Sequence, residues 1–362
     1  MLTLSRLQTE LDDRAATPAP AQPSFWKEFR RRMRYLFCCG ANNNRLEPDF
    51  TDLNEVYVPK MYPDWLPLEQ NQRYQNNKQR LYQAAYENIC PADHIVPERD
   101  KRGELVQIGS GRYGTVFLAR YKPTGDYVAV KRFKRNKSSE IHIRREAAFL
   151  DILQETKLCP KFYGILEEKR QSTSKFANLS IVMELVRLKE NTKQCFNLKS
   201  FVQTQFARGG LTTKDWFNFN IELAQGLMEV HERGICILNL KDENIMVSRD
   251  SEGAIHPRLV DLGGVVLLDD DNPIVPPQTF TERKLNIFNK KRPSLAPELF
   301  KSSKPTAQID IFSLGCIFED LGKREMMCDL TELALWCTTS DPSLRPTLAV
   351  IVKELGELAV KL

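Results

Sequence analysis

Residues 237–247 read ILNLKDENIMV, a short polar stretch enclosed by apolar residues. An amphipathic run from Phe217 to Arg233 precedes it, and Gly234 follows that run, as is typical for the end of a helix. The closing residues 245–247 are typical of a short strand. A polar loop between a helix and a strand is a common place for functional side chains. The candidates in this loop are Asn239, Lys241 and Asn244.

A glycine-rich turn precedes this loop in the sequence, where residues 109–114 read GSGRYG between two apolar runs. The pattern G-x-G-x-x-G alone is weak, because a glycine turn in any hairpin can produce it. A dinucleotide-binding fold would begin a helix here, whereas β-branched and aromatic residues after Gly114 continue a second strand. Small residues let backbone N–H groups lie close over phosphates. Residues 128–131 then read VAVK, which indicates a third strand that ends in Lys131.

The chain resembles eukaryotic protein kinases, because these motifs and later ones occur in the order found in that family. The polar loop resembles the catalytic loop H-R-D-L-K-x-x-N, and the turn and strand resemble G-x-G-x-x-G and V-A-I-K. The later motifs are DLG at residues 261–263, APE at 296–298, DIFSLG at 310–315, and Arg345, which matches the arginine that pairs with the APE glutamate. The resemblance implies an α+β, bilobal kinase-like fold with a small β-rich N-lobe and a helical C-lobe, within residues 101–362.

The same resemblance implies a site for ATP and Mg²⁺. Lys131 would bind the phosphates and needs a neighbouring anion to orient it, which the resemblance assigns to Glu146. An ordinary surface carboxylate is the alternative for Glu146, since other acidic residues flank it in the sequence. Asn244 and Asp261 would be the oxygen ligands of Mg²⁺. The implied nucleotide-binding residues are Ile108, Gly109, Gly111, Gly114, Val116, Ala129, Lys131, Glu146, Met183 as gatekeeper, and Glu184 and Val186, whose backbone would face adenine.

The catalytic loop departs from the family pattern at three positions. Asn239 occupies the place of the catalytic aspartate, and a carboxamide can orient a hydroxyl group but cannot accept its proton. Leu238 replaces the arginine that binds a phosphorylated activation loop. Ile237 replaces a histidine, although with Leu150 and Leu262 it could still complete an apolar stack.

These losses favour a nucleotide-binding pseudokinase that acts as a scaffold or allosteric partner in signalling. Asn239 and Lys241 are the residues that remain at catalytic positions. Asp242 is a nearby carboxylate, but the family geometry places it on the wrong part of the loop. A weakly active serine/threonine kinase that transfers the γ-phosphate of ATP to protein hydroxyls is the first alternative, and a structural adaptor that needs no nucleotide is the second. The segment between Gly315 and Asp341 is short, whereas in the family it usually carries an additional helix that helps to dock protein substrates.

Composition sets broader limits on the chain. Its 362 residues are 42% apolar and carry a formal net charge of +5, which allows one large core or two lobes and does not indicate a nucleic-acid partner. The nine cysteines form no C-x-x-C pair, so neither a zinc site nor a disulfide framework is indicated. No cleavable signal sequence and no apolar run of membrane-spanning length occur, so we expect a cytoplasmic location.

The first hundred residues divide into three segments by composition. Residues 1–23 are polar and rich in Ala and Pro near their end, which predicts a disordered tail. Residues 24–40 form a basic amphipathic pattern that ends in Cys38 and Cys39, so we expect peripheral membrane attachment by S-acylation of these cysteines. The alternative is an amphipathic helix with unmodified cysteines that packs on the kinase-like domain or on a protein partner. Residues 41–100 are predicted to be an N-terminal extension of unassigned role.

Overall fold

The structure is a computed structural model of the whole chain. It describes residues 86–135, 138, 140–168, 176–188, 195–204, 210–268, 294–300 and 305–361, all of which belong to one compact unit, Val56–Leu362. The predicted tail 1–23, the predicted anchor 24–40 with Cys38 and Cys39, and residues 41–85 of the predicted extension lie outside the described residues.

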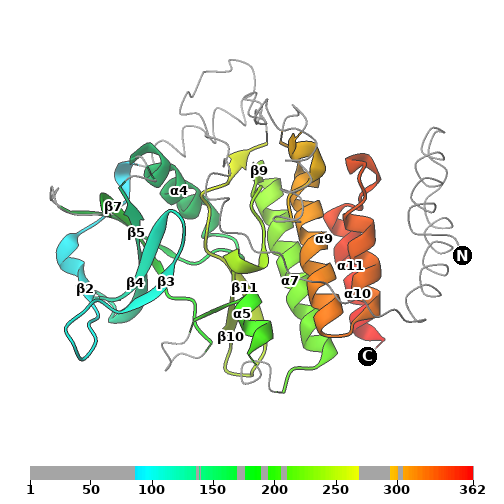
Figure 1. The fold of residues 1–362 in the computed structure, drawn as a ribbon, viewed down its shortest axis with the longest axis horizontal. Helices are drawn as coiled ribbons and strands as arrows, with labels where there is room; N and C mark the ends of the chain where they lie inside the picture. Colours follow the sequence, from blue (N-terminus) through cyan, green and yellow to red (C-terminus); the bar gives the residue numbers. More distant parts are fainter. Residues whose placement is uncertain are drawn as a thin grey trace, which may run out of the picture. The chain divides into compact units, whose positions relative to one another are not determined.

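The N-terminal half of this unit is a seven-stranded sheet with one helix (Figure 1). The sheet order is β1-β6-β7-β5-β4-β2, with β3 paired to β4, and only the β1–β6 pair is parallel. The strands are β1 Ile89–Cys90, β2 Ile95–Pro97, β3 Gln107–Ser110, β4 Gly114–Tyr121, β5 Asp126–Lys134, β6 Phe162–Glu167 and β7 Phe176–Glu184. The helix α4, Glu140–Leu153, follows β5 in the chain.

Both faces of this sheet are covered by apolar side chains. One face belongs to the main core, which includes Phe149 and Leu150 of α4. The other face forms a separate cluster, built from Cys90, Ile95, Ala119, Val128, Val130, Leu166 and Val182. Val128 and Val130 alternate with Ala129 along β5, so successive residues enter different cores. The alternation explains why β5 is apolar throughout the stretch that the sequence marked as a strand.

Strands β1 and β2 pair at opposite ends of the sheet path, yet only residues 91–94 separate them in the chain. The sheet must therefore curl until its two ends approach one another. Both strands lie within residues 41–100, the segment predicted to be an N-terminal extension. Each strand is too short to give a two-residue periodicity that sequence analysis can recognise.

The C-terminal half is mostly helical, and Figure 1 shows α7, α9 and α11 side by side. Its helices are α5 Leu198–Gln203, α7 Thr213–Glu232, α9 Ala307–Arg324, α10 Cys328–Cys337 and α11 Leu348–Val360. Helix α7 begins with a capping box, in which the Thr212 hydroxyl accepts from the Asp215 N–H and the Asp215 side chain accepts from the Thr212 N–H. Helix α7 packs on α11, and α9 packs on α10. This arrangement and the sheet together confirm the predicted α+β fold with a β-rich and a helical part.

Short elements connect the helices in this half. The strands β8 Phe196–Asn197, β10 Ile245–Arg249 and β11 Ile255–Leu259 form one small sheet, and β9 Ile235–Cys236 pairs with β12 Val266–Leu267. The 3-10 turns are η1 Ala92–His94, η2 Asp242–Asn244, η3 Pro297–Phe300 and η4 Pro342–Leu344. Within the described ranges, none of the helices is long and apolar enough to cross a bilayer.

A histidine on β11 is held by two carboxylates. His256 Nδ1 lies 2.7 Å from Glu222 Oε2 of α7, and its Nε2 lies 3.2 Å from Asp250 Oδ2. Burial alone would lower the pKa of His256, but the hydrogen bonds to Glu222 and Asp250 outweigh it and raise the pKa above 6.5. His256 therefore ties the β10–β11 hairpin to α7 through Glu222.

Helices α9 and α10 are joined directly. Only residues 325–327 lie between them, and Met326 has a positive φ of 56°, with 87% of its surface exposed. All residues from 305 to 361 are described, so this part of the chain contains no additional helix at that place. The short segment expected between Gly315 and Asp341 thus consists of the rest of α9, a tight link and α10.

Candidate functional site

The glycine-rich turn connects β3 and β4 at one edge of the candidate site. The Gly111 N–H donates to the Gly114 carbonyl oxygen at 2.9 Å, and Lys134 Nζ of β5 donates to the Gly111 carbonyl oxygen at 2.7 Å. A Cβ on Gly114 would lie 2.7 Å from the Arg132 carbonyl oxygen, so only glycine lets β4 approach β5 here. A Cβ on Gly111 would meet nothing within 4 Å. Gly114 is therefore needed for packing, whereas Gly111 leaves open space over the turn.

Lys131 lies on the central strand β5, between Val116 of β4 and Ile181 of β7 in the register. Its Nζ lies 2.5 Å from Glu146 Oε1 of α4 and 3.2 Å from Asp261 Oδ1. The Lys131 and Glu146 side chains are only 12% and 8% exposed. The structure thus brings together three residues that are far apart in the sequence, and Glu146 is not a surface carboxylate.

The three charges shift one another's pKa values. Burial alone would lower the pKa of Lys131, but the carboxylates of Asp261 and Glu146 raise it well above its ordinary value. The Lys131 ammonium lowers the pKa of Asp261. Burial raises the pKa of Glu146, which Lys131 only partly offsets. Lys131 is therefore cationic and Asp261 anionic at neutral pH, as phosphate and metal binding both require.

Four strands contribute apolar residues near Lys131. Ile108, Val116, Ala129 and Met183 all pack in or against the main core. Met183, 4% exposed, is opposite Ala129 in the register of β5 and β7, in the position that the sequence assigned to a gatekeeper.

The chain after Met183 offers backbone groups. The Glu184 N–H already donates to the Lys161 carbonyl oxygen at 2.9 Å, so of its two backbone groups only the carbonyl oxygen is suited to a contact with adenine. Val186 is buried, with 6% of its surface exposed. Gly109 completes the nucleotide-site predictions on β3, where a Cβ would be in ordinary contact with Val116 at 3.7 Å.

Asn244 and Asp261 are neighbours at one end of the β10–β11 hairpin. The Val260 N–H donates to the Asn244 carbonyl oxygen at 3.1 Å, which fixes the two segments together. Asn244 Nδ2 donates to the Asn239 carbonyl oxygen at 3.0 Å, so its Oδ1 is the atom suited to a metal. Asp261 uses Oδ1 for both Lys131 and the Gly263 N–H, which leaves Oδ2 without a hydrogen bond to the described residues.

This donor set fits Mg²⁺ that is shared with phosphates. Two hard oxygen donors from the protein are typical of Mg²⁺, which usually keeps waters and phosphate oxygens as its other ligands. In the described part of the chain, no group of three or more His, Cys, Asp or Glu is placed to hold a metal ion. Lys241 lies close enough to Asp261 to lower its pKa as well, and it also forms an ion pair with Glu243 at 3.1 Å.

Asn239 is held in the loop by its backbone. Its N–H donates to the Ile237 carbonyl oxygen at 2.7 Å, and its carbonyl oxygen accepts from Asn244 Nδ2. Gly264 packs on it so closely that a Cβ there would lie 2.9 Å from the Asn239 Cβ. These contacts fix the backbone of Asn239 next to the segment that begins with Asp261.

Asp242 does not replace the missing carboxylate. Burial raises its pKa, and the charged groups that act on it are Lys199, Glu243 and Asp320. None of these belongs to the cluster formed by Lys131, Glu146 and Asp261, called the Lys131 cluster below. Asp242 therefore faces α5 and the end of α9 rather than the candidate site.

An aspartate of α9 holds the backbone of the loop that contains Asn239. Asp310 is fully buried, and its two carboxylate oxygens accept the N–H groups of Ile237 at 2.7 Å and Leu238 at 2.8 Å. His231 Nε2 of α7 lies 2.9 Å from the same carboxylate. Leu238 has a positive φ of 58°, a strained conformation for a residue other than glycine, and these bonds hold it there. Sequence reasoning missed this role, although a single aspartate in the apolar run 309–318 was a usable signal.

The two apolar substitutions in the loop are buried in different clusters. Ile237 belongs to the main core with Leu150 and Leu262, all three at most 3% exposed. Leu238, 9% exposed, belongs to a small cluster that also includes Val266 and Ile309. An apolar contact thus occupies the position from which an arginine would reach a phosphate.

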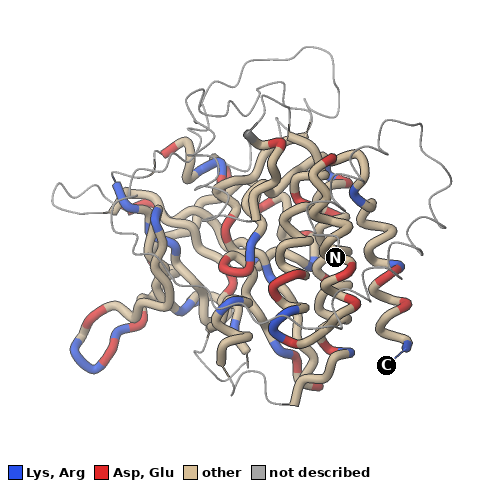
Figure 2. Tube along the Cα trace, turned by 45° about the vertical axis from the view of Figure 1, so that its right-hand side comes forward, with Lys and Arg blue, Asp and Glu red and all other residues tan. Residues whose placement is uncertain are grey.

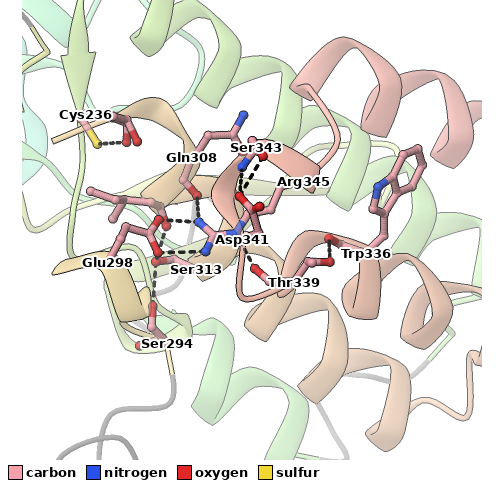
Figure 3. Close-up of polar contacts among 12 residues, drawn as sticks. Cys236, Ser294, Glu298, Gln308, Ser313, Trp336, Thr339, Asp341, Ser343 and Arg345 are labelled. Atoms are coloured by element: carbon pink, nitrogen blue, oxygen red, sulfur yellow. Dashed lines mark hydrogen bonds and ion pairs between the residues drawn. The ribbon is translucent and has the colours of Figure 1, made fainter. Parts of the chain in front are cut away.

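A buried ion pair connects the APE motif to the C-terminal helices (Figure 3). Arg345 Nη1 and Nη2 lie 2.5 Å and 2.8 Å from the two Glu298 carboxylate oxygens, so the pair is bidentate. The Arg345 side chain has no exposed surface, and it also donates to the carbonyl oxygens of Thr339 and Gln308 at 2.9 Å and 2.8 Å. Through these four hydrogen bonds, Arg345 connects the APE motif to the first turn of α9 and to the chain after α10.

Charged residues of both signs are interspersed over the described chain, and Figure 2 shows no extended segment of a single sign. With Lys241, the residues Lys131, Glu146 and Asp261 bring two cations and two carboxylates from four different segments to the site. The net charge near the site is therefore close to balanced, and a bound polyphosphate would gain from Lys131 and Lys241 rather than from a wider basic surface.

Comparisons with known proteins agree with this geometry. Residues 103–333 match the family described as protein kinase domain. Cyclin-dependent kinase B1-1 of Arabidopsis thaliana is 27% identical over 243 residues, which are 63% of this chain and 70% of that protein. Cell division control protein 2 homolog 1 of Trypanosoma brucei brucei is 28% identical over 221 residues, 60% of this chain and 63% of that protein. Serine/threonine-protein kinase cek1 of Schizosaccharomyces pombe is 30% identical over 164 residues, 44% of this chain but only 11% of that protein.

Proposed function

Because the chain belongs to the protein kinase family, we propose that it binds ATP together with Mg²⁺ and transfers phosphate only poorly, as a pseudokinase that acts through protein partners. The observation that carries this proposal is the contrast within one site. Lys131 lies within contact distance of both Glu146 and Asp261, while Asn239 occupies the position of the proton acceptor. The groups that bind a nucleotide are present, and the group that completes the reaction is not.

Each residue of the candidate site has a distinct role in this proposal. Lys131 binds phosphate oxygens, Glu146 orients it, and Lys241 adds a second cation near the transferred group. Asn244 Oδ1 and Asp261 Oδ2 hold Mg²⁺, which supplies charge neutralisation at the phosphates when it is bound. Asn239 can accept or donate a hydrogen bond to a substrate hydroxyl, but it cannot take up the proton.

The short link between α9 and α10 also supports limited phosphoryl transfer. The three-residue link between α9 and α10 leaves out the additional helix that the family uses to dock protein substrates. Leu238 provides no charge for a phosphorylated activation loop. The role of scaffold or allosteric partner rests on these two features together with the loss at Asn239.

A weakly active serine/threonine kinase is the second candidate. One observation favours it: Asp310 holds the backbone of Ile237 and Leu238 in place even though the side chains there have changed. Since proton transfer contributes only part of the rate enhancement, a loop in the correct conformation can retain some transfer. The cyclin-dependent and serine/threonine kinases among its relatives carry the same implication.

Nucleotide binding is the first measurement. Isothermal titration calorimetry and thermal shift with ATP, with and without Mg²⁺, should show binding that Lys131→Met abolishes. Lys122→Met is the matched control, because Lys122 is exposed on a turn of the same lobe. ATP at 100 times its Kd should add about 2.7 kcal/mol to the free energy of unfolding. No binding at millimolar ATP, or binding equally weakened by both substitutions, would contradict the proposal and favour a nucleotide-free adaptor.

The predicted membrane attachment rests on the sequence alone. Attachment of a cytoplasmic protein to membranes through Cys38 and Cys39 concerns residues outside the described ranges, so it stays a prediction from sequence. Cell fractionation of the protein and of a double Cys→Ser variant at these positions would test it.

A further inference from the structure

Residues 86–97, the N-terminal strap, lie before the part of the chain that matches the kinase family. The strap pairs with the sheet at both of its ends, as β1 with β6 and as β2 with β4. The Ile165 N–H donates to the Asn88 carbonyl oxygen, and the Lys122 N–H donates to the His94 carbonyl oxygen, each at 2.8 Å. The strap is therefore fixed to the lobe that carries Lys131.

Strand β6 is shaped to receive the strap. Gly164 has a φ of +125°, and a Cβ at this position would lie 2.8 Å from the Cys90 N and 3.1 Å from the Asn88 carbonyl oxygen. Cys90 itself is 1% exposed in the second apolar cluster. Any side chain at position 164 would push the strap away, so the close approach depends on this glycine.

Arg144 connects the strap to helix α4. Its guanidinium lies 4.8 Å from the centre of the Tyr86 ring, an arrangement typical of a cation–π contact. Its Nη2 donates to Glu167 Oε1 of β6 at 2.7 Å, and its Nε donates to Glu140 Oε1 at 2.9 Å. The Arg144 side chain is only 10% exposed. One residue of α4 is therefore held by its own helix, by β6 and by the strap.

Arg144 precedes Glu146 by two residues on the same helix, which transmits position along its axis. Arg145 holds the helix from a second direction, since its Nη2 donates to the Val265 carbonyl oxygen at 3.0 Å. Glu146 thus lies next to two anchors, one on the strap and β6, the other on the segment after Asp261. Its 2.5 Å contact with Lys131 is sensitive to a shift of the helix by less than 1 Å.

We propose that the strap, acting through Tyr86 and Arg144, positions Glu146 on Lys131 and so sets the affinity of the site for nucleotide. Tyr86 and Arg144 are positioning residues, because neither belongs to the Lys131 cluster. The effect on nucleotide rests on the proposed function, whereas the effect on the Lys131–Glu146 pair does not.

The test compares Tyr86→Ala and Arg144→Met with a matched control, Arg120→Met. Arg120 is also stacked on a tyrosine, 4.5 Å from the Tyr127 ring, and lies 3.9 Å from a glutamate, but it is on β4 and makes no contact with α4. The Kd for ATP with Mg²⁺ should rise about threefold to tenfold in Tyr86→Ala and in Arg144→Met, the range of coupling between residues in contact, and stay unchanged in Arg120→Met. In a Glu146→Gln background, Arg144→Met should have no further effect on the Kd, which a merely structural role would not produce.

A second readout needs no nucleotide. The Lys131 side chain is only 12% exposed while it is paired with Glu146. Displacing Glu146 should make Lys131 more accessible, so its acylation by an amine-reactive ester, followed by mass spectrometry, should accelerate in Tyr86→Ala and Arg144→Met but not in Arg120→Met. Acylation rates and Kd values equal to those of the wild type in both strap variants would overturn the inference. If the wild type does not bind ATP but Lys131 acylation still accelerates in the strap variants, the proposed function fails and the positioning role stands.

Discussion

Replacing Asn239 by aspartate tests whether one missing carboxylate accounts for the expected loss of phosphoryl transfer. The substitution is nearly isosteric, and the hydrogen bonds that hold position 239 use its backbone N–H and carbonyl oxygen rather than its side chain. Asp310 holds the preceding residue in the same way. The loop should therefore keep its conformation when the amide becomes a carboxylate.

The expected gain follows from the chemistry of a general base. Proton acceptors contribute roughly 10²–10⁴ in rate, or about 3–5 kcal/mol of the barrier. We expect an increase of roughly one to three orders of magnitude, because the Lys131 and Asp261 groups are already placed while the short α9–α10 link still limits substrate alignment. Transfer to a generic protein substrate should accordingly stay poor.

ATP turnover and autophosphorylation of the wild type and of Asn239→Asp provide the assay, with Asp261→Ala as the blank. Asn178→Asp is the matched control, since it makes the same chemical change at an exposed position on β7. A wild type as fast as an ordinary kinase and slowed by Asp261→Ala would refute the reasoning about Asn239. No gain in Asn239→Asp, despite measured ATP binding, would show that the site differs from a kinase site by more than this carboxylate.

Three further outcomes follow from the described contacts. Arg345→Met should lower the free energy of unfolding by about 3–5 kcal/mol in urea denaturation, because it removes the bidentate cation from the buried Glu298 carboxylate; a loss below about 1 kcal/mol would contradict the role of this pair. Gly114→Ala should lower the free energy of unfolding by about 1–3 kcal/mol, because its Cβ would overlap the β5 backbone, while Gly111→Ala should leave the melting temperature unchanged. Equal melting temperatures of the two variants would contradict this difference. Because the pKa of His256 is raised in the folded protein, the stability that its charged form adds is complete below pH 6.5 and is lost as the pH rises through the folded pKa. The difference in free energy of unfolding between wild type and His256→Gln should therefore shrink from pH 6 to pH 9. A constant difference would refute this role of His256.

The motifs predicted from sequence were those in which a short pattern carries its own chemistry. A lysine at the end of an apolar strand, a glycine-rich turn and an aspartate after a strand each indicate a role before their partners are known. The structure places Lys131 in contact with Glu146 and Asp261, at distances that no pattern in the sequence could give. The fold class followed from the order of these motifs.

The features that escaped prediction depend on approach between distant segments. Asp310 begins the DIFSLG motif, but the sequence assigned no role to its carboxylate, because its two bonds to the loop depend on α9 lying next to residues 237 and 238. Gly164 has no motif at all, and its need for a positive φ appears only when β1 lies against it. In both cases the residue type is explained by a contact, and the contact is set by tertiary packing.

The strap also has a consequence for how the chain can be shortened. A version that begins at residue 101 would lose β1 and β2, and with them the strands that cover the outer edge of β6 and the far part of β4. The uncovered edges would present rows of unpaired N–H and carbonyl groups. The second apolar cluster would also lose Cys90 and Ile95, and this loss would expose the valines of that cluster. Open sheet edges beside exposed apolar surface favour intermolecular strand pairing. The twelve residues of the strap therefore protect the isolated domain from aggregation, and a soluble fragment should start before Tyr86.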